Sequence, residues 1–161
     1  MFEQISTKIQ NQEAAEKILN GWRMKGDTIV FTNGCFDILH FGHIDYLAKA
    51  RNLGNRLVIG LNSDDSVKRL KGAHRPINDF ATRINLLAAL QLVDLVIEFD
   101  QDTPLELIQK LRPNILVKGG DWQLEQIVGA DFVLANGGQV LSLPFVDGYS
   151  TTNIEQKIKN Q

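Results

Sequence analysis

A chain of 161 residues, 43% hydrophobic and 22% charged, has the size and composition of one globular domain that buries its own core. Its net charge of -2 argues against a general role in binding nucleic acid or membrane surfaces. A single cysteine, Cys35, excludes an internal disulfide, and the polar N-terminal sequence does not resemble a signal peptide. We therefore expect a single domain over residues 1–161, located in the cytoplasm, with no nucleic-acid or membrane partner.

The first part of the sequence alternates helical and strand patterns. Apolar residues at helical spacing predict a helix over residues 11–25 that packs on the edge of a sheet. The β-branched run at 29–31 is typical of a buried strand, and an amphipathic helix follows over about 41–53. A second apolar strand covers 57–61, and a capped helix then runs to about residue 70. This order predicts a β-α-β unit and hence an α/β fold with a parallel sheet.

The turn between the first strand and its helix contains the most informative residues. It breaks at Asn33 and Gly34, where an α/β protein presents backbone amides and the positive end of a helix to an anion. His40 and His43 lie at the helix start, and residues three apart share a helix face, so both imidazoles can point at one ligand atom. Gly42 has no side chain, which lets a phosphate approach the backbone.

A zinc site is an alternative use of this turn. Cys35, Asp37, His40 and His43 are all potential zinc ligands and lie close together in the sequence. No second cluster of cysteine or histidine completes such a site, so we expect no metal held by the protein itself.

The next segment, KRLKGAHRP over residues 68–76, is the most basic part of the chain. Lys68 and Arg69 are expected on a solvated face, whereas Gly72 and Pro76 place the following residues in a loop. That loop follows a strand and a short helix, so it lies on the side of the sheet where phosphates would bind.

The second half of the chain continues the α/β pattern. A helix over 80–90 carries Arg83, which can pair with a carboxylate such as Asp79. A strand is predicted over 92–99 and a helix from Asp102 to about residue 111.

A fourth apolar strand ends at Lys118, before Gly119 and Gly120. A lysine at the carboxyl end of a parallel strand stands at the ligand crevice of an open α/β sheet. Residues 126–135 are predicted to form a helix and a strand, and 139–143 the last strand.

The terminal helix begins with three consecutive hydroxyl residues at 150–152. Thr152 and Glu155 have the spacing of a capping box, which accounts for one of the three hydroxyls. The partial positive charge of the helix N-terminus favours an anion beside the others.

Four segments resemble one family. Residues 32–43, TNGCFDILHFGH, resemble the signature of the H-x-G-H nucleotidyltransferase superfamily, which contains the cytidylyltransferases, the pantetheine-phosphate adenylyltransferases and, more distantly, the class I aminoacyl-tRNA synthetases. Residues 71–76 resemble the family's K-x-x-x-R-P-I loop, 118–122 the K-G-G-D segment of heptose-phosphate adenylyltransferases, and 148–154 the G-x-S-T-T-x-I motif. The resemblance implies a Rossmann-like three-layer sandwich of the nucleotidylyl transferase type, with a parallel sheet.

The resemblance also implies a reaction. The chain is similar to the adenylyltransferase half of bifunctional heptose kinase/adenylyltransferases, here expected to stand alone. Such an enzyme transfers AMP from ATP to D-glycero-D-manno-heptose 1-phosphate and supplies ADP-heptose for lipopolysaccharide core or capsule. The implied cofactor is Mg²⁺, carried mainly by the nucleotide phosphates, and the implied assembly is a homodimer.

The family motifs assign roles to individual residues. Arg83 becomes a structural or active-site residue that holds the preceding loop, and this interpretation and pairing with Asp79 both stay open. The residues expected to act in catalysis are His40, His43, Lys71 and Lys118. Those expected to bind the nucleotide or its phosphates are Thr32, Asn33, Gly34, Cys35, Phe36, Asp37, Gly42, Arg75, Arg83, Gly119, Asp121, Ser150, Thr151 and Thr152.

Other functions remain as alternatives. A cytidylyltransferase acting on glycerol 3-phosphate or a similar alcohol or sugar phosphate shares two of the motifs, but usually has an arginine where this chain has Phe145. A non-catalytic nucleotide-binding module is an alternative of another class. A dehydrogenase is disfavoured because no G-x-G-x-x-G follows the first strand. The choice among ATP, CTP and GTP and the anomer of the sugar stay open.

Overall fold

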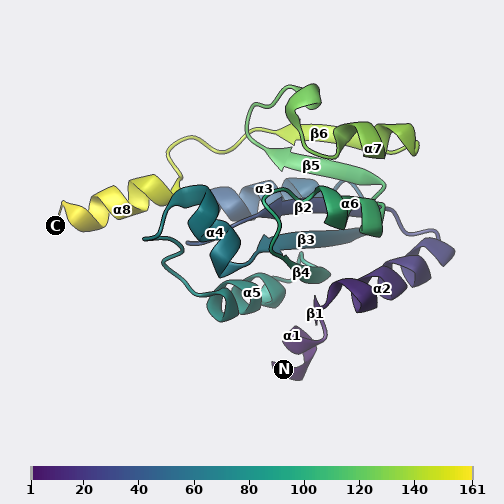
Figure 1. Cartoon of the computed structure of the whole chain (residues 1–161), viewed down its shortest axis with the longest axis horizontal. Helices are drawn as coiled ribbons and strands as arrows, with labels where there is room; N and C mark the ends of the chain where they lie inside the picture. Colours follow the sequence, from purple (N-terminus) through teal and green to yellow (C-terminus); the bar gives the residue numbers. More distant parts are fainter. Residues whose placement is uncertain (1, 161) are drawn as a thin grey trace.

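The strands of the protein are short apolar runs rich in valine, isoleucine and leucine. Such runs are typical of parallel sheets, because helices cover both faces of the sheet and bury the side chains on either side. A computed structural model describes residues 2–160 of the chain (Figure 1). Its six-stranded sheet has the order β1-β4-β3-β2-β5-β6, and every neighbouring pair is parallel. The strands are β1 Ile9–Gln10, β2 Ile29–Gly34, β3 Arg56–Asn62, β4 Leu95–Phe99, β5 Ile115–Gly119 and β6 Gln139–Leu143.

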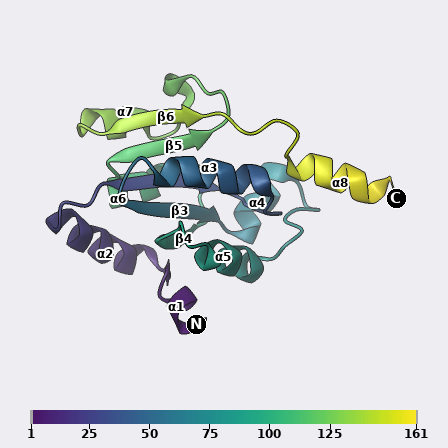
Figure 2. The same cartoon turned by 180° about the vertical axis from the view of Figure 1, so that it is seen from behind.

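Helices cover both faces of the sheet and give it three layers (Figures 1 and 2). One apolar core gathers residues of α2 Gln12–Met24, α6 Leu105–Leu111 and α7 Ala130–Ala135 against one face. The other core gathers residues of α3 Phe41–Arg51 and α5 Phe80–Ala89, with α1 Phe2–Ser6 alongside α5. Both cores exclude water from large side chains such as Phe31 and Leu47, which are fully buried.

Two helices lie toward the carboxyl ends of the strands. Helix α4, Asp64–Lys71, begins directly after β3, with Ser63 as its N-cap. Helix α8, Thr151–Lys159, follows β6 and extends beyond the sheet, with no buried residue (Figures 1 and 2). A short 3-10 turn, η1 Leu124–Gln126, joins β5 to α7. Within residues 2–160, no helix is long and apolar enough to cross a membrane.

The strand order creates a topological switch point between β2 and β5. From β2 the chain adds β3 and then β4 on one side, and it later returns to add β5 and β6 on the other. In open α/β sheets a ligand crevice forms at such a point, outside the carboxyl ends of the two strands. The turn after Gly34 and the end of β5 at Lys118 therefore meet at one place.

The predicted α/β class and parallel sheet are confirmed, and most predicted elements begin or end within three residues of the observed ones. Two predictions were wrong. Helix α2 packs on a face of the sheet beside α6, whereas the edge is formed by the two-residue strand β1, which is too short for a pattern. The segment predicted as a helix and a strand at 126–135 holds only the end of η1 and α7.

Candidate active site

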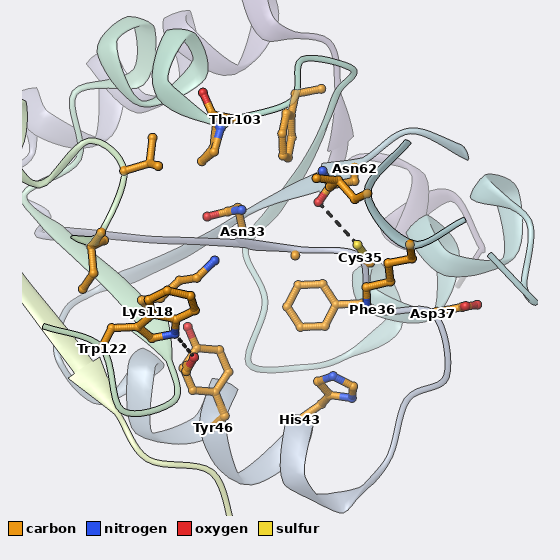
Figure 3. Close-up of a pocket in the computed structure, with 18 of the residues that line it drawn as sticks. Asn33, Cys35, Phe36, Asp37, His43, Tyr46, Asn62, Thr103, Lys118 and Trp122 are labelled. Atoms are coloured by element: carbon orange, nitrogen blue, oxygen red, sulfur yellow. Dashed lines mark hydrogen bonds between the residues drawn. The ribbon is translucent and has the colours of Figure 1, made fainter. Parts of the chain in front are cut away.

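A cavity of about 550 Å³ lies at the switch point (Figure 3). It is bounded by the end of β2, the first turns of α3, the end of α4, the end of β5 and the segment leading to α8. The sequence-predicted site residues that line it are Asn33, Gly34, Cys35, Phe36, Asp37, His43, Lys71, Lys118, Gly119 and Thr151. The others, Thr32, His40, Gly42, Arg75, Arg83, Asp121, Ser150 and Thr152, lie outside its lining.

The turn after β2 is held in an unusual backbone conformation. Phe36 has φ of 44°, in the left-handed region that non-glycine residues rarely adopt. Its ring folds back over Gly34, where a Cβ atom would lie 3.0 Å from ring atom Cε2. Glycine at position 34 therefore lets the Phe36 ring pack closely on the backbone, and the turn carries Cys35 and Phe36 into the wall of the cavity.

The two motif histidines form a stacked pair. Their ring centroids are 3.9 Å apart and their planes differ by 26°. His40 is the N-cap of α3 with extended backbone (φ -145°), and His43 lies in the first turn. The prediction of one shared helix face was therefore wrong for His40, although the side chains do meet. His43 alone lines the cavity, and the Nδ1 atoms of both rings are buried without a hydrogen-bond partner in the described part of the chain.

Burial keeps the histidine pair neutral. It lowers the pKa of His40, and it lowers the pKa of His43 to about 4, where the nearby His40 and Lys71 act in the same direction. A neutral imidazole carries one N–H, which can donate a hydrogen bond to a phosphate oxygen.

The depressed pKa of His43 predicts a loss of stability in acid. The unfolded chain takes up the proton near pH 6.5 and the folded chain only near 4, so the free energy of unfolding falls as the pH drops through this window. We expect a loss of roughly 3 kcal/mol between these limits from this group. Urea denaturation of the wild type and His43→Gln at several pH values measures it, and equal pH slopes in the two proteins would contradict it.

Gly42 has a packing role that its sequence position did not indicate. A Cβ atom there would lie 3.1 Å from the His40 imidazole and 3.2 Å from Cβ of Tyr149. Glycine thus lets His40 and Tyr149 pack against the first turn of α3. Gly42 is buried beneath these side chains, which gives the glycine a packing reason in addition to the predicted phosphate contact.

Two lysines make the cavity cationic. Lys118 at the end of β5 is largely buried, which lowers its pKa, and its Nζ lies 5.7 Å from the centroid of the Trp122 ring. Figure 3 shows Lys118 and His43 approaching the cavity from different elements, with Phe36 between them. Lys71 reaches the lining from the end of α4. Among residues 2–160 neither lysine has a salt-bridge partner.

The acidic residues of the lining do not cancel these charges. Asp37 is paired with Arg75, with 2.8 Å between Nε and a carboxylate oxygen. Asp102 is paired with Arg69 at 2.9 Å. The cavity therefore presents two unpaired cations and favours an anionic ligand.

Arg83 holds the loops behind the cavity. It is fully buried and donates to the backbone carbonyls of Cys35 and Asn62 at 2.7 and 2.9 Å. Its carboxylate partner is Asp64, 2.7 Å away, whereas Asp79 caps α5. Of the two interpretations left open by the sequence, the structure supports the one in which Arg83 fixes the preceding loop, with an ion pair as part of that role.

The C-terminal hydroxyls have separate positions. Ser150 is the N-cap of α8, and its Oγ accepts from the backbone N–H of Asn153 at 3.0 Å. The predicted capping box of Thr152 with Glu155 was wrong, because Glu155 pairs with Arg75 instead. Only Thr151 of the three lines the cavity, and Thr152 is exposed.

Two further residues predicted to bind the nucleotide lie outside the cavity lining. Thr32 is fully buried, with Oγ1 2.5 Å from the hydroxyl oxygen of Tyr46, so it packs beneath the cavity floor. Asp121 is exposed and lies outside the lining, next to the left-handed Gly120.

An aromatic wall is the main feature that the predicted site lacked. Tyr46 of α3 is buried, which raises its pKa to about 12, and its hydroxyl donates to the carbonyl of Val117. The Phe145 ring lies against Tyr46 and so close to Gly119 that a Cβ there would approach it to 2.4 Å. Trp122 completes the wall by donating from Nε1 to the Gly119 carbonyl at 2.9 Å. The paired glycines at the end of β5 were the available signal, since they mark a backbone closely covered by other groups.

The sequence of the chain is similar to those of known proteins. The family model for cytidylyltransferase-like proteins matches residues 31–157. The protein named bifunctional protein HldE from Geotalea uraniireducens is 55% identical over 152 residues, which are 94% of this chain and 31% of that protein. HldE from Marinomonas sp. is 58% identical over 135 residues, 84% of this chain and 28% of that protein. The chain thus spans about a third of the length of these relatives.

Solved structures agree on the fold. A lipopolysaccharide core biosynthesis protein from Thermoplasma volcanium superposes with a TM-score of 0.60 at 30% identity and covers 78% of this chain and all of its own. Pantoate-beta-alanine ligase from Francisella tularensis, solved with an ATP analogue and beta-alanine, has a TM-score of 0.62 at 16% identity over 94% of this chain and 76% of its own. Because its sequence identity is only 16%, the second similarity is evidence about the fold alone.

Proposed function

The chain belongs to the cytidylyltransferase-like family of nucleotidyltransferases, and on that premise we propose that it transfers AMP from ATP to D-glycero-D-manno-heptose 1-phosphate. The products are ADP-heptose and pyrophosphate. The observation that carries the proposal is a cationic cavity at the switch point, with two unpaired lysines beside a neutral histidine. The heptose comes from the motif resemblance and from the HldE relatives.

The proposed reaction is an in-line displacement. A phosphate oxygen of heptose 1-phosphate attacks the α-phosphorus of ATP, and the bond from that phosphorus to the bridging oxygen of the β-phosphate breaks as pyrophosphate leaves. Both reactants are anions, so the protein contributes alignment and charge neutralisation rather than covalent catalysis. Lys71 and Lys118 hold phosphates, and His43 donates a hydrogen bond to the α-phosphate, with His40 stacked behind it. Thr151 and the N-terminus of α8 receive the outer phosphates.

Magnesium is proposed to enter with ATP. In the described residues, no group of three or more histidines, cysteines and carboxylates is arranged to hold a metal ion. The carboxylates of the lining, Asp37 and Asp102, are already paired with arginines. The donor set therefore fits an ion bound mainly by phosphate oxygens, which would supply further charge neutralisation.

Cys35 tests whether a nucleotide occupies the cavity. Burial raises the pKa of its thiol, so at pH 8 we expect alkylation by iodoacetamide to be slower than in the urea-unfolded chain. Because Cys35 lines the cavity, ATP with Mg²⁺ should slow the reaction further. Mass spectrometry of the alkylated protein measures both rates. Equal rates with and without nucleotide would contradict binding at this cavity.

Pyrophosphate release is the direct test of the reaction. The purified protein is assayed with Mg²⁺ and with ATP, CTP or GTP, each against both anomers of heptose 1-phosphate and against glycerol 3-phosphate. Turnover only with ATP and a heptose phosphate supports the proposal and identifies the anomer. Turnover with CTP and glycerol 3-phosphate supports the second candidate, a cytidylyltransferase, which the name of the family favours. Tight nucleotide binding without turnover in any combination supports a non-catalytic module.

The remaining expectations stay proposals. We propose that each protomer is a single nucleotidyltransferase domain and that the protein acts as a homodimer in the cytoplasm. We also propose that its product serves surface glycan synthesis, as the name of the Thermoplasma relative suggests. Light scattering of the purified protein after size exclusion measures the assembly, and a mass of 18.0 kDa would overturn the dimer.

A further inference from the structure

One buried guanidinium joins three segments beside the cavity. Arg75 belongs to the loop between α4 and α5, and its side chain is 8% exposed. It pairs on one side with Asp37 in the turn after β2, which is 1% exposed. On the other side it pairs with Glu155 of α8. We call these three residues the Arg75 link.

The link is rigid at its Asp37 end. The carboxylate of Asp37 also accepts from the backbone N–H groups of Ile77 and Asn78, at 2.9 and 2.8 Å. The side chain of Asn78 in turn donates to the carbonyl of Asp37. The loop that carries Arg75 is thereby fixed to the turn that leads to His40 and His43.

At its other end the link anchors a helix that has little else to hold it. Helix α8 buries no residue and extends away from the sheet (Figures 1 and 2). Before it, Tyr149 packs on the first turn of α3, with its ring 5.2 Å from that of Phe41. Over the described residues, Glu155 is the one α8 residue with a salt bridge to another element. Tyr149 and Glu155 are therefore two points at which α8 and the segment before it are held to the rest of the protein.

The charges of the link argue against Arg75 as a phosphate ligand. Its single positive charge faces two carboxylates, and Arg75 lies outside the cavity lining. A further anion beside Arg75 would be repelled by these two carboxylates, which together outweigh the single positive charge. We therefore infer that the Arg75 side chain binds carboxylates of the protein and not a phosphate of the ligand.

We propose that Arg75, Asp37 and Glu155 are positioning residues that set the N-terminus of α8 against the histidine turn. In this arrangement Thr151 at the start of α8 lines the cavity, and without it Thr151 moves out of reach of the outer phosphates. The ligand in this statement rests on the proposed function, whereas the placement of α8 does not.

Glu155 is the residue to change, because it is partly exposed and its loss leaves the Asp37–Arg75 pair intact. In Glu155→Ala we expect faster amide hydrogen exchange over residues 151–159 without any ligand. With ATP we expect a KM about tenfold higher and a smaller change in kcat, the scale for losing one charged hydrogen bond. Glu155→Gln keeps an acceptor for Arg75 and should restore most of both properties. Lys157→Ala, on the same helix and exposed, is the matched control and should change neither.

The outcomes separate this inference from the proposed function. Unchanged exchange of α8 in Glu155→Ala would overturn the link even if the enzyme turns over as proposed. A KM for ATP that falls in Glu155→Ala would also overturn it, because Glu155 would then compete with phosphate for Arg75. Faster exchange of α8 in a protein that shows no turnover with any substrate would support the link while the proposed reaction fails.

Discussion

Replacing His43 by alanine is expected to lower kcat for nucleotidyl transfer by about 10²–10³-fold, the cost of losing one preorganised donor to developing charge. His43 is the motif histidine that lines the cavity, and its low pKa keeps it as a neutral donor throughout the physiological range. The effect should fall on kcat more than on KM, because the hydrogen bond strengthens as charge builds on the α-phosphate. Steady-state pyrophosphate release measures both constants.

His40 and His74 give this experiment its comparison and its control. His40→Ala removes the ring stacked on His43 and should reduce kcat through loss of orientation. His74 is the exposed histidine of the basic loop and lies outside the cavity lining, so His74→Ala should retain the wild-type rate. Thermal unfolding of each variant checks that the fold is intact. Unchanged turnover in both His40→Ala and His43→Ala would overturn the assignment of the reaction to this site.

Local patterns were sufficient to predict most of the fold. Apolar runs and helical spacing depend on residues near each other in sequence, and they predicted β2 to β6 and the alternation that makes the sheet parallel. The motif residues lie at or after the carboxyl ends of the strands. Because the strands are parallel, these ends lie at one edge of the sheet, and His43, Lys71 and Lys118 therefore line one cavity. Strand β1 was not predicted, because a strand of two residues is too short to show a periodic pattern.

Pairing between distant residues could not be predicted in the same way. Arg75 and Glu155 both had local interpretations, as a phosphate ligand and as half of a capping box, and the structure pairs them with each other. Gly42 likewise packs against Tyr149, far along the chain, a contact that the sequence motif did not predict. These partners are chosen by the packing of whole elements, so the residue types alone left them undetermined.

The largest expected effect on stability follows from the same kind of distant contact, at Arg83. Arg83→Ala should lower the free energy of unfolding by about 3–5 kcal/mol, because it removes a fully buried side chain and leaves buried hydrogen-bond acceptors without their donor. The change leaves Asp64 without its cation and leaves the carbonyls of Cys35 and Asn62 without a donor. Urea denaturation followed by circular dichroism measures the loss, which is a large share of the 5–15 kcal/mol typical of a domain.

Arg69 is the matched control for Arg83, because it too bridges loops through carboxylates, but on the surface. Its side chain is 44% exposed where it meets Asp100 and Asp102, and water compensates for the loss of such pairs. Arg69→Ala should therefore lower the free energy of unfolding far less than Arg83→Ala does. Equal losses in the two variants would mean that burial does not set the contribution of Arg83. A large loss in Arg83→Ala alone, with a reduced rate of nucleotidyl transfer in the protein that still folds, would show that the buried arginine holds the turn that presents Cys35 and Phe36 to the cavity.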